Sequence, residues 1–170
     1  MKEPADAGMT ATIYMLRTTQ QHHVQLSAMA DIKANILITA SSILLSVTIA
    51  LLPTEGFRPS LALLATGVLV GLFFAVLAVV PKFGRPKPAD HRMNLLSFGS
   101  FAHIPEDDFI AALTELSKDA DRVFAAQARD IHQLGSYLES SKYRWLRLAY
   151  LAFLAGLVGG GIVELAQLLR

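Results

Sequence analysis

The sequence predicts an all-α membrane protein with three transmembrane helices and long cytoplasmic helical extensions that pack antiparallel. Two observations lead to this fold class: 53% of the 170 residues are hydrophobic, and many of them fall in three long blocks without charge. A helix needs about 20 apolar residues to cross roughly 30 Å of hydrocarbon. The alternative is a soluble domain with a buried helical core, but three such blocks leave it too little polar surface.

Composition and helix breakers set the boundaries of the predicted segments. These are an N-terminal cytoplasmic helix (1–33), a transmembrane hairpin (34–81, with spans at about 34–54 and 60–81), a cytoplasmic linker (82–104), a cytoplasmic amphipathic helix (105–145) and a third transmembrane helix (146–169). No Pro or Gly lies between Met9 and Leu52, so the N-terminal helix is expected to continue into the first span.

The chain changes character after the second span. Pro81 to Pro88 is rich in helix breakers and predicts an extended linker, and residues 94–99 predict either a short loop or a short strand. Pro105 and the acidic residues that follow it predict a helix start, because acids complement the dipole of the first turn. Apolar residues then recur at helical spacing, and charged residues such as Asp130 are expected mostly on the other face.

Basic residues near the span ends predict the orientation in the membrane. One side carries Lys33, Lys82, Arg85, Lys87, Arg92, Lys142, Arg144 and Arg147, whereas the other carries only Arg58 and Arg170. We therefore expect a multi-pass protein of a bacterial inner membrane, with the N-terminus and residues 82–147 in the cytoplasm. The lipid bilayer is its expected surroundings.

Small residues four positions apart occur in all three predicted spans. They are Ser42 and Ser46, Gly67 and Gly71, and Gly156 and Gly160. Because apolar area does not drive helix association in lipid, such residues favour close packing of backbones. The pattern predicts helix packing within one chain or between chains, and we expect a homo-oligomer. The alternative is that Gly is simply common in membrane helices.

The composition argues against several other classes of protein. The chain has no Cys, its net charge is +1, and its five His residues have no acidic partners at metal-binding spacing. No phosphate-binding loop and no nucleophile motif is present. We therefore expect neither an enzyme nor a nucleic-acid binder, with no catalytic residue, no metal site and no cofactor.

Four short motifs carry a resemblance to a known family. They are Asp31–Asn35 (DIKAN), Asn94–Gly99 (NLLSFG), Glu106–Phe109 (EDDF) and Lys142–Tyr150 (KYRWLRLAY). Their order around the apolar blocks resembles the transmembrane effector family of Pycsar anti-phage defence systems and, more distantly, SLATT-like membrane effectors.

The resemblance implies a function. A cognate pyrimidine cyclase, which need not contact the effector, would make cyclic CMP or cyclic UMP. The effector would sense that nucleotide at its cytoplasmic face and impair the inner membrane, causing abortive infection. A non-gated structural or scaffolding membrane protein that assembles with a partner is the alternative.

A ligand site is expected where the polar helices enter the spans. The candidate ligand-binding residues are Asp31, Lys33, Asn35, Tyr143, Arg144 and Arg147, which the predicted packing brings level with one another. Arg and Lys suit a phosphate, and an aromatic ring can stack on a base. The alternatives are that these residues anchor the spans at lipid headgroups, or that Asp31 pairs with Arg144 or Arg147 and holds the bundle closed.

Overall fold

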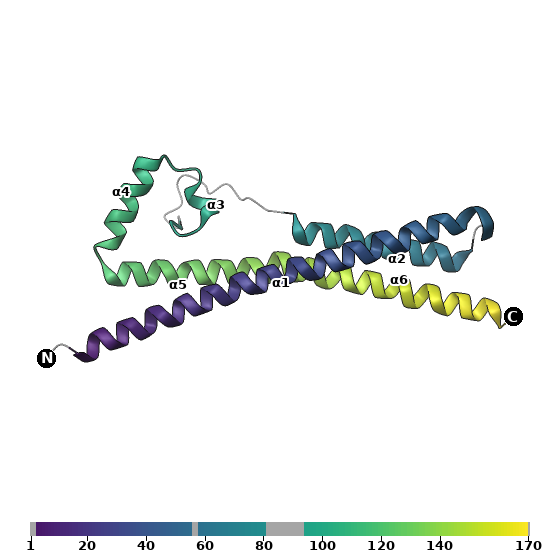
Figure 1. Ribbon diagram of the computed structural model, residues 1–170, viewed down its shortest axis with the longest axis horizontal. Coiled ribbons are helices and arrows are strands. Elements are labelled where there is room, and N and C mark those ends of the chain that lie inside the picture. The colour runs from purple at the N-terminus through teal and green to yellow at the C-terminus, as the bar shows by residue number, and fades with distance from the viewer. Residues whose placement is uncertain (1–2, 56–57, 81–93, 170) are drawn as a thin grey trace. The chain divides into compact units, whose positions relative to one another are not determined.

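The computed structural model describes residues 3–55, 58–80 and 94–169, and within these ranges the chain is helical with no strand. Its elements are α1 (Glu3–Glu55), α2 (Pro59–Val79), α3 (Phe98–Phe101), α4 (Glu106–Ser117), α5 (Ala120–Tyr137), the π-helix η1 (Leu138–Tyr143) and α6 (Arg144–Leu168) (Figure 1). Three helical stretches are long and apolar enough to cross a bilayer: Thr10–Leu51, Pro59–Val79 and Ala120–Leu168. The predicted all-α class with three candidate spans is confirmed.

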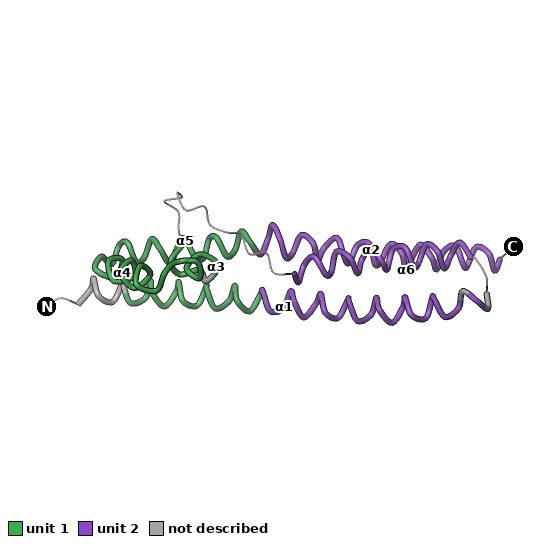
Figure 2. Tube along the Cα trace, turned by 90° about the horizontal axis from the view of Figure 1, so that it is seen from above, with its two compact units in different colours: residues 1–26, 81–137 green, residues 27–80, 138–170 purple. Residues whose placement is uncertain are grey.

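The chain divides into two compact units (Figure 2). The first unit comprises residues 1–26 and 81–137, and the second comprises residues 27–80 and 138–170. Helix α1 contributes its N-terminal part to the first unit and its C-terminal part to the second. A single helix therefore covers both the predicted N-terminal helix and the predicted first span.

The second unit is built from α1, α2 and α6. Its buried residues form two layers, one with Ala34, Ala78 and Leu146 and the next with Leu37, Ala75 and Ala149. From the first layer to the second the numbers rise in α1 and α6 and fall in α2. Helix α2 is thus antiparallel to both neighbours, whereas α1 and α6 run in the same direction.

This direction corrects one part of the predicted fold. The two long helices were expected to pack antiparallel, but in the second unit α1 and α6 are parallel. The physical reason is the intervening helix: α2 returns the chain to the side from which α1 started, so α6 must leave that side again.

Small residues fill the interior of the second unit and large apolar residues cover its outside. On α1 the buried positions are Ala30, Ala34, Leu37, Ser41 and Thr48, which keep the spacing of one helix face. The opposite face exposes Ile32, Ile36, Ile43 and Val47, each more than half accessible. A soluble protein would not leave such a surface in water, whereas a bilayer covers it at no cost.

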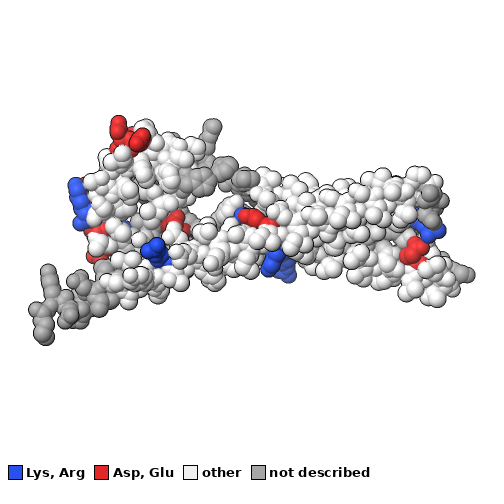
Figure 3. All heavy atoms as spheres, viewed as in Figure 1, with Lys and Arg blue, Asp and Glu red and all other residues white. Residues whose placement is uncertain are grey.

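Charge is confined to the ends of the second unit. On the face drawn in Figure 3, its helices show neither basic nor acidic side chains between a cluster at one end and a cluster at the other. The uncharged stretches behind this pattern are residues 34–54, 59–80 and 148–163. The second unit therefore has the surface of a membrane-spanning bundle.

The first unit differs in detail from the predicted amphipathic helix over 105–145. The chain breaks at Lys118 and Asp119 into α4 and α5, because Asp119 accepts hydrogen bonds from the backbone N–H groups of Asp121 (2.9 Å) and Arg122 (3.2 Å) and so caps a new helix. The rings of Phe101 at the end of α3 and Phe109 in α4 lie 5.1 Å apart. Residues 94–97, expected as a loop or strand, form a turn that leads into α3. The predicted linker at 81–93 lies outside the described residues.

Candidate functional site

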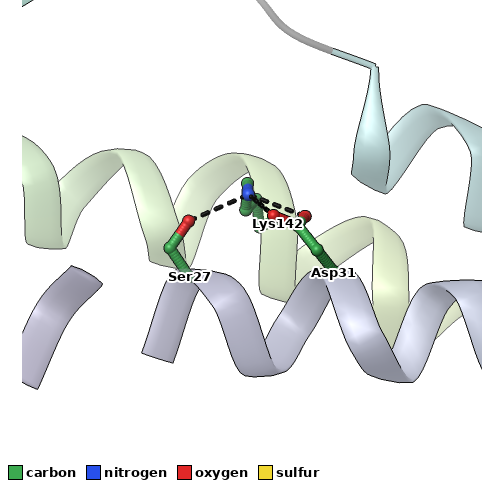
Figure 4. Close-up of polar contacts among 3 residues, drawn as sticks. All are labelled: Ser27, Asp31 and Lys142. Carbon is green, nitrogen blue, oxygen red and sulfur yellow. Dashed lines mark hydrogen bonds and ion pairs between the residues drawn. The ribbon is translucent and has the colours of Figure 1, made fainter. Parts of the chain in front are cut away.

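One partly buried ion pair lies where α1 and η1 meet in the second unit, just before α6. The Lys142 ammonium donates to Asp31 Oδ2 at 2.6 Å, to Asp31 Oδ1 at 2.7 Å and to Ser27 Oγ at 2.9 Å (Figure 4). Only 12% of the Lys142 side chain is accessible, against 37% for Asp31. An ammonium has three N–H groups, so this cluster of Ser27, Asp31 and Lys142, the border latch, satisfies the buried cation fully.

The backbone around Lys142 is unusual for a membrane helix. Lys142 belongs to the six-residue π-helix η1, between α5 and α6. Single π-turns within α-helices are rare and occur frequently at functional sites. Lys142 also continues the stripe of Leu146 and Ala149, both buried, so its ammonium reaches α1 instead of water. A local departure from α-helix therefore lies beside the buried charge.

Aromatic side chains surround the border latch. The rings of Phe74 and Trp145 are stacked with centres 5.6 Å apart, and the guanidinium carbon of Arg144 lies 5.4 Å from the centre of the Trp145 ring. The Tyr150 hydroxyl donates to the backbone carbonyl of Lys33 at 3.3 Å. These contacts link the three helices of the second unit at one end of the spans.

The structure brings only part of the predicted ligand site together. Asp31 pairs with Lys142, so its expected pairing with Arg144 or Arg147 is wrong. Arg144, Arg147, Lys33 and Asn35 are exposed, and Tyr143 is half-buried among the core residues.

Lys142 was expected only among the basic residues that predict the orientation, and its pairing with Asp31 was not predicted. The signal that could have revealed it is the spacing of Ser27 and Asp31, one turn apart on the buried side of α1.

A second polar cluster closes the other end of the second unit. Arg58 donates to Glu164 Oε1 at 3.1 Å, and the hydroxyl of Ser60 donates to the other carboxylate oxygen of Glu164. Both ionised side chains are partly exposed. The interaction joins the segment at the start of α2 to α6, and it gives Glu164 a partner at the end of its span.

Two of the predicted packing residues meet directly. A Cβ added at Gly67 would lie 2.3 Å from the Cα of Gly156, so the backbones of α2 and α6 touch there. Gly71 faces Ala149 and Phe153, and Gly160 faces Ser60 and Leu64. Ser42 and Ser46 are exposed instead, and their hydroxyls donate to the carbonyls one turn earlier. The buried hydroxyl residues of α1 are Ser41 and Thr48.

The first unit holds a buried polar network that the sequence analysis did not foresee. Asp130 was expected on the polar face, but it is buried and accepts hydrogen bonds from Gln20 and Asn94, both at 2.8 Å. Asn94 also donates to Gln133 at 2.9 Å and accepts from the backbone N–H of Leu96 at 3.0 Å. The network fixes the residues after the linker against α5, which places Asn94 rigidly.

Comparison with known proteins gives one family. The model of the Pycsar effector protein domain matches residues 14–167, which is nearly the whole chain. No curated protein and no solved structure matches it. The match includes the second candidate span, nearly all of the first and third, the border latch and the buried network of the first unit. The chain therefore belongs to the Pycsar effector protein domain family and is a transmembrane effector of a Pycsar anti-phage system.

Proposed function

We propose that this effector is a ligand-gated, membrane-disrupting protein. Cyclic CMP or cyclic UMP, made by a cognate pyrimidine cyclase, is sensed at the cytoplasmic face, and the effector then impairs the integrity of the bacterial inner membrane. The infected cell stops growing before the phage matures. Family membership supports the signalling system, and the apolar outer surface of the second unit supports a site of action in the bilayer.

The border latch is the observation that best supports gating by a ligand. A structural span does not need a Lys held with 12% accessibility and bonded through all its N–H groups, because a surface Lys can snorkel to the headgroups instead. Such a pair resists separation, since one charge without its partner would stay buried. A closed state held by one ion pair can be released by ligand binding, whose coupling energies are typically about 1–3 kcal/mol.

The charges also support the orientation. Lys33, Lys142, Arg144 and Arg147 gather at one end of the second unit, whereas Arg58 lies at the other end and is paired with Glu164. Cytoplasmic ends of spans are enriched in Lys and Arg. This distribution supports the proposal that the N-terminus and residues 82–147 lie in the cytoplasm, where a nucleotide made by a cytoplasmic cyclase would reach them.

In the proposed function, Asp31 and Lys142 act as a switch between a closed and an open state. Asp31 already binds Lys142, and its carboxylate would repel a phosphate placed beside it. Direct contact of Arg144, Arg147, Lys33, Asn35 or Tyr143 with a nucleotide stays a prediction. Nucleotide binding by their alanine variants tests it.

The experiment is membrane-potential dye fluorescence in cells that express the effector together with an inducible pyrimidine cyclase. Depolarisation that depends on cyclic CMP or cyclic UMP synthesis is expected, and a cyclase without catalytic activity should give none. Intact membrane potential with both nucleotides would refute gating and favour the scaffold. Asp31→Asn and Lys142→Met weaken the latch, so they should depolarise cells at lower nucleotide levels.

An exposed ion pair in the same chain is the matched control for the latch variants. Lys118 donates to Glu115 at 2.6 Å, as short as the latch, but its side chain is 66% accessible. Exposed pairs contribute little, about 0–1 kcal/mol. Lys118→Met should therefore leave the nucleotide dependence unchanged. An equal effect of Lys118→Met and Lys142→Met would show that loss of a cation, and not of the latch, alters the response.

A further inference from the structure

A basic hollow lies in the first unit. Its volume is about 310 Å³. The residues that line it are Asn94, Leu95, Leu116, Arg122, Ala125, Ala126 and Arg129. Pockets for small molecules are roughly 300–1,000 Å³, so this one suits a mononucleotide-sized molecule and not a larger one.

The two arginines share one face of α5 because of their spacing. Arg122 and Arg129 are seven residues apart, which is about two turns and roughly 10 Å along the helix. Between them, Ala125 and Ala126 supply only methyl groups, and the small side chains leave the hollow open. The guanidinium groups of Arg122 and Arg129 therefore lie on either side of the shallow surface formed by Ala125 and Ala126.

The two arginines give this hollow a positive charge that a phosphate could contact. No acidic residue lines it, and within the described part of the chain neither guanidinium takes part in an ion pair. Two neighbouring carboxylates are held by other groups: Asp130 accepts hydrogen bonds from Gln20 and Asn94, and Asp119 caps α5. A planar guanidinium that presents several N–H groups binds a phosphate through paired, charge-assisted hydrogen bonds.

The rest of the lining suits the other half of a nucleotide. Leu95 and Leu116 are half-buried and provide apolar contact for a ring. Asn94 is 4% accessible and is held by hydrogen bonds to Asp130, Gln133 and Leu96. The wall that Asn94 and Leu95 form is therefore fixed before any ligand arrives, which lowers the ordering cost of binding.

We infer that this hollow is the binding site for the phosphate of a small cyclic nucleotide, with Arg122 and Arg129 as its phosphate ligands. The inference rests on the proposed function for the identity of the ligand. It differs from the sequence prediction, which placed the ligand at Arg144 and Arg147. Helix α5 passes into η1, which carries Lys142, without an intervening loop, so a ligand on α5 binds directly before the π-turn in the chain.

Isothermal titration of the full chain in lipid nanodiscs with cyclic CMP and with cyclic UMP tests the site. Arg122→Gln and Arg129→Gln should each weaken binding of the preferred nucleotide by about tenfold or more, and lysine at either position should restore part of it. Arg17→Gln is the control, because it removes one exposed arginine of the first unit that does not line the hollow. Inorganic phosphate at millimolar concentration should compete with the nucleotide.

The outcomes separate the site from the function. Unchanged binding by Arg122→Gln and Arg129→Gln, with loss in Arg144→Gln and Arg147→Gln, overturns the inference while the proposed function stands. Absence of binding to the wild-type chain, with nucleotide-dependent depolarisation in cells, also overturns it. Binding that depends on Arg122 and Arg129 without depolarisation supports the site and refutes the proposed function. Thermal melting shows that each variant is folded.

Discussion

The contact between Gly67 and Gly156 makes a sharp prediction about how the spans are held together. In Gly67→Ala the new Cβ would lie 2.3 Å from the Cα of Gly156, 2.7 Å from its backbone nitrogen and 2.9 Å from the carbonyl oxygen of Ala152. All three are backbone atoms, so no side chain can rotate away. Ordinary van der Waals contact begins near 3.4 Å, so α2 and α6 must separate by about 1 Å at this point.

Such a separation has a measurable cost. Extra methyl groups in a well-packed interior typically cost about 1–3 kcal/mol, and backbone clashes belong at the upper end, so we expect about 2–3 kcal/mol. That energy lowers the folded-to-unfolded ratio roughly 30- to 150-fold. The assay is reversible unfolding in mixed micelles by titration with a denaturing detergent, followed by far-ultraviolet circular dichroism.

Gly161 provides the matched control for this prediction. It lies on the same helix as Gly156, but a Cβ added there meets nothing within 4 Å. Gly161→Ala makes the same chemical change without the clash, and should leave stability unchanged or raise it slightly through helix propensity. If Gly67→Ala and Gly161→Ala unfold at the same detergent concentration, the close approach of α2 and α6 is refuted.

Three further predictions use the same unfolding assay. Glu164→Gln loses its ion pair with Arg58 and should cost about 1 kcal/mol, because both partners are partly exposed; a larger loss would indicate that the pair is buried by lipid or by a second chain. Asp130→Asn turns an acceptor of two hydrogen bonds into a partial donor and should cost about 1–3 kcal/mol, with faster amide exchange in α5; native-like exchange would contradict the network. Ser41 is fully buried, and its hydroxyl has no partner within the described residues, so Ser41→Ala should be neutral or stabilising by up to about 1 kcal/mol; a clear loss of stability would reveal a bound water or partner.

Composition and length were enough to predict the helices of the second unit, because the blocks 34–54 and 59–80 are as long as a span requires and the shorter block 148–163 continues apolar after Glu164. The faces of those helices were less accessible to prediction. Ser42 and Ser46 have the spacing of a packing motif, yet Ser41 and Thr48 are the buried pair. In lipid both faces of a span are apolar, so hydrophobic periodicity does not reveal which one meets the neighbouring helix. The neighbouring helix determines which face of the span is buried.

The spacing of Ser27 and Asp31 indicates a polar buried side on α1, but it does not identify Lys142 as the partner of Asp31. Extrapolation along a regular α-helix counts 3.6 residues per turn, and a π-turn adds an extra residue. The π-helix η1 therefore shifts the phase of every residue after it relative to α5, and Lys142 faces Asp31 where Arg144 or Arg147 was expected. The buried network around Asp130 escaped prediction because Asn94 and Gln20 lie far from it in sequence.

The packing of the second unit also constrains how a membrane could be impaired. Its interior is made of Ala, Gly, Ser and a few larger residues, and at Gly67 and Gly156 the backbones touch. Where Gly67 meets Gly156, no space remains between α2 and α6 for an ion or water path. If the effector conducts ions, we expect the path to run between copies or to open only after the helices separate. The border latch ties α1 to α6 at one end of the bundle, and Glu164 with Arg58 and Ser60 ties α2 to α6 at the other. Release of the latch would weaken the hold on α1, which Tyr150 and the buried layers still contact, and would leave the contact between α2 and α6 unchanged. We therefore expect α1 to be the helix that moves when the effector is activated.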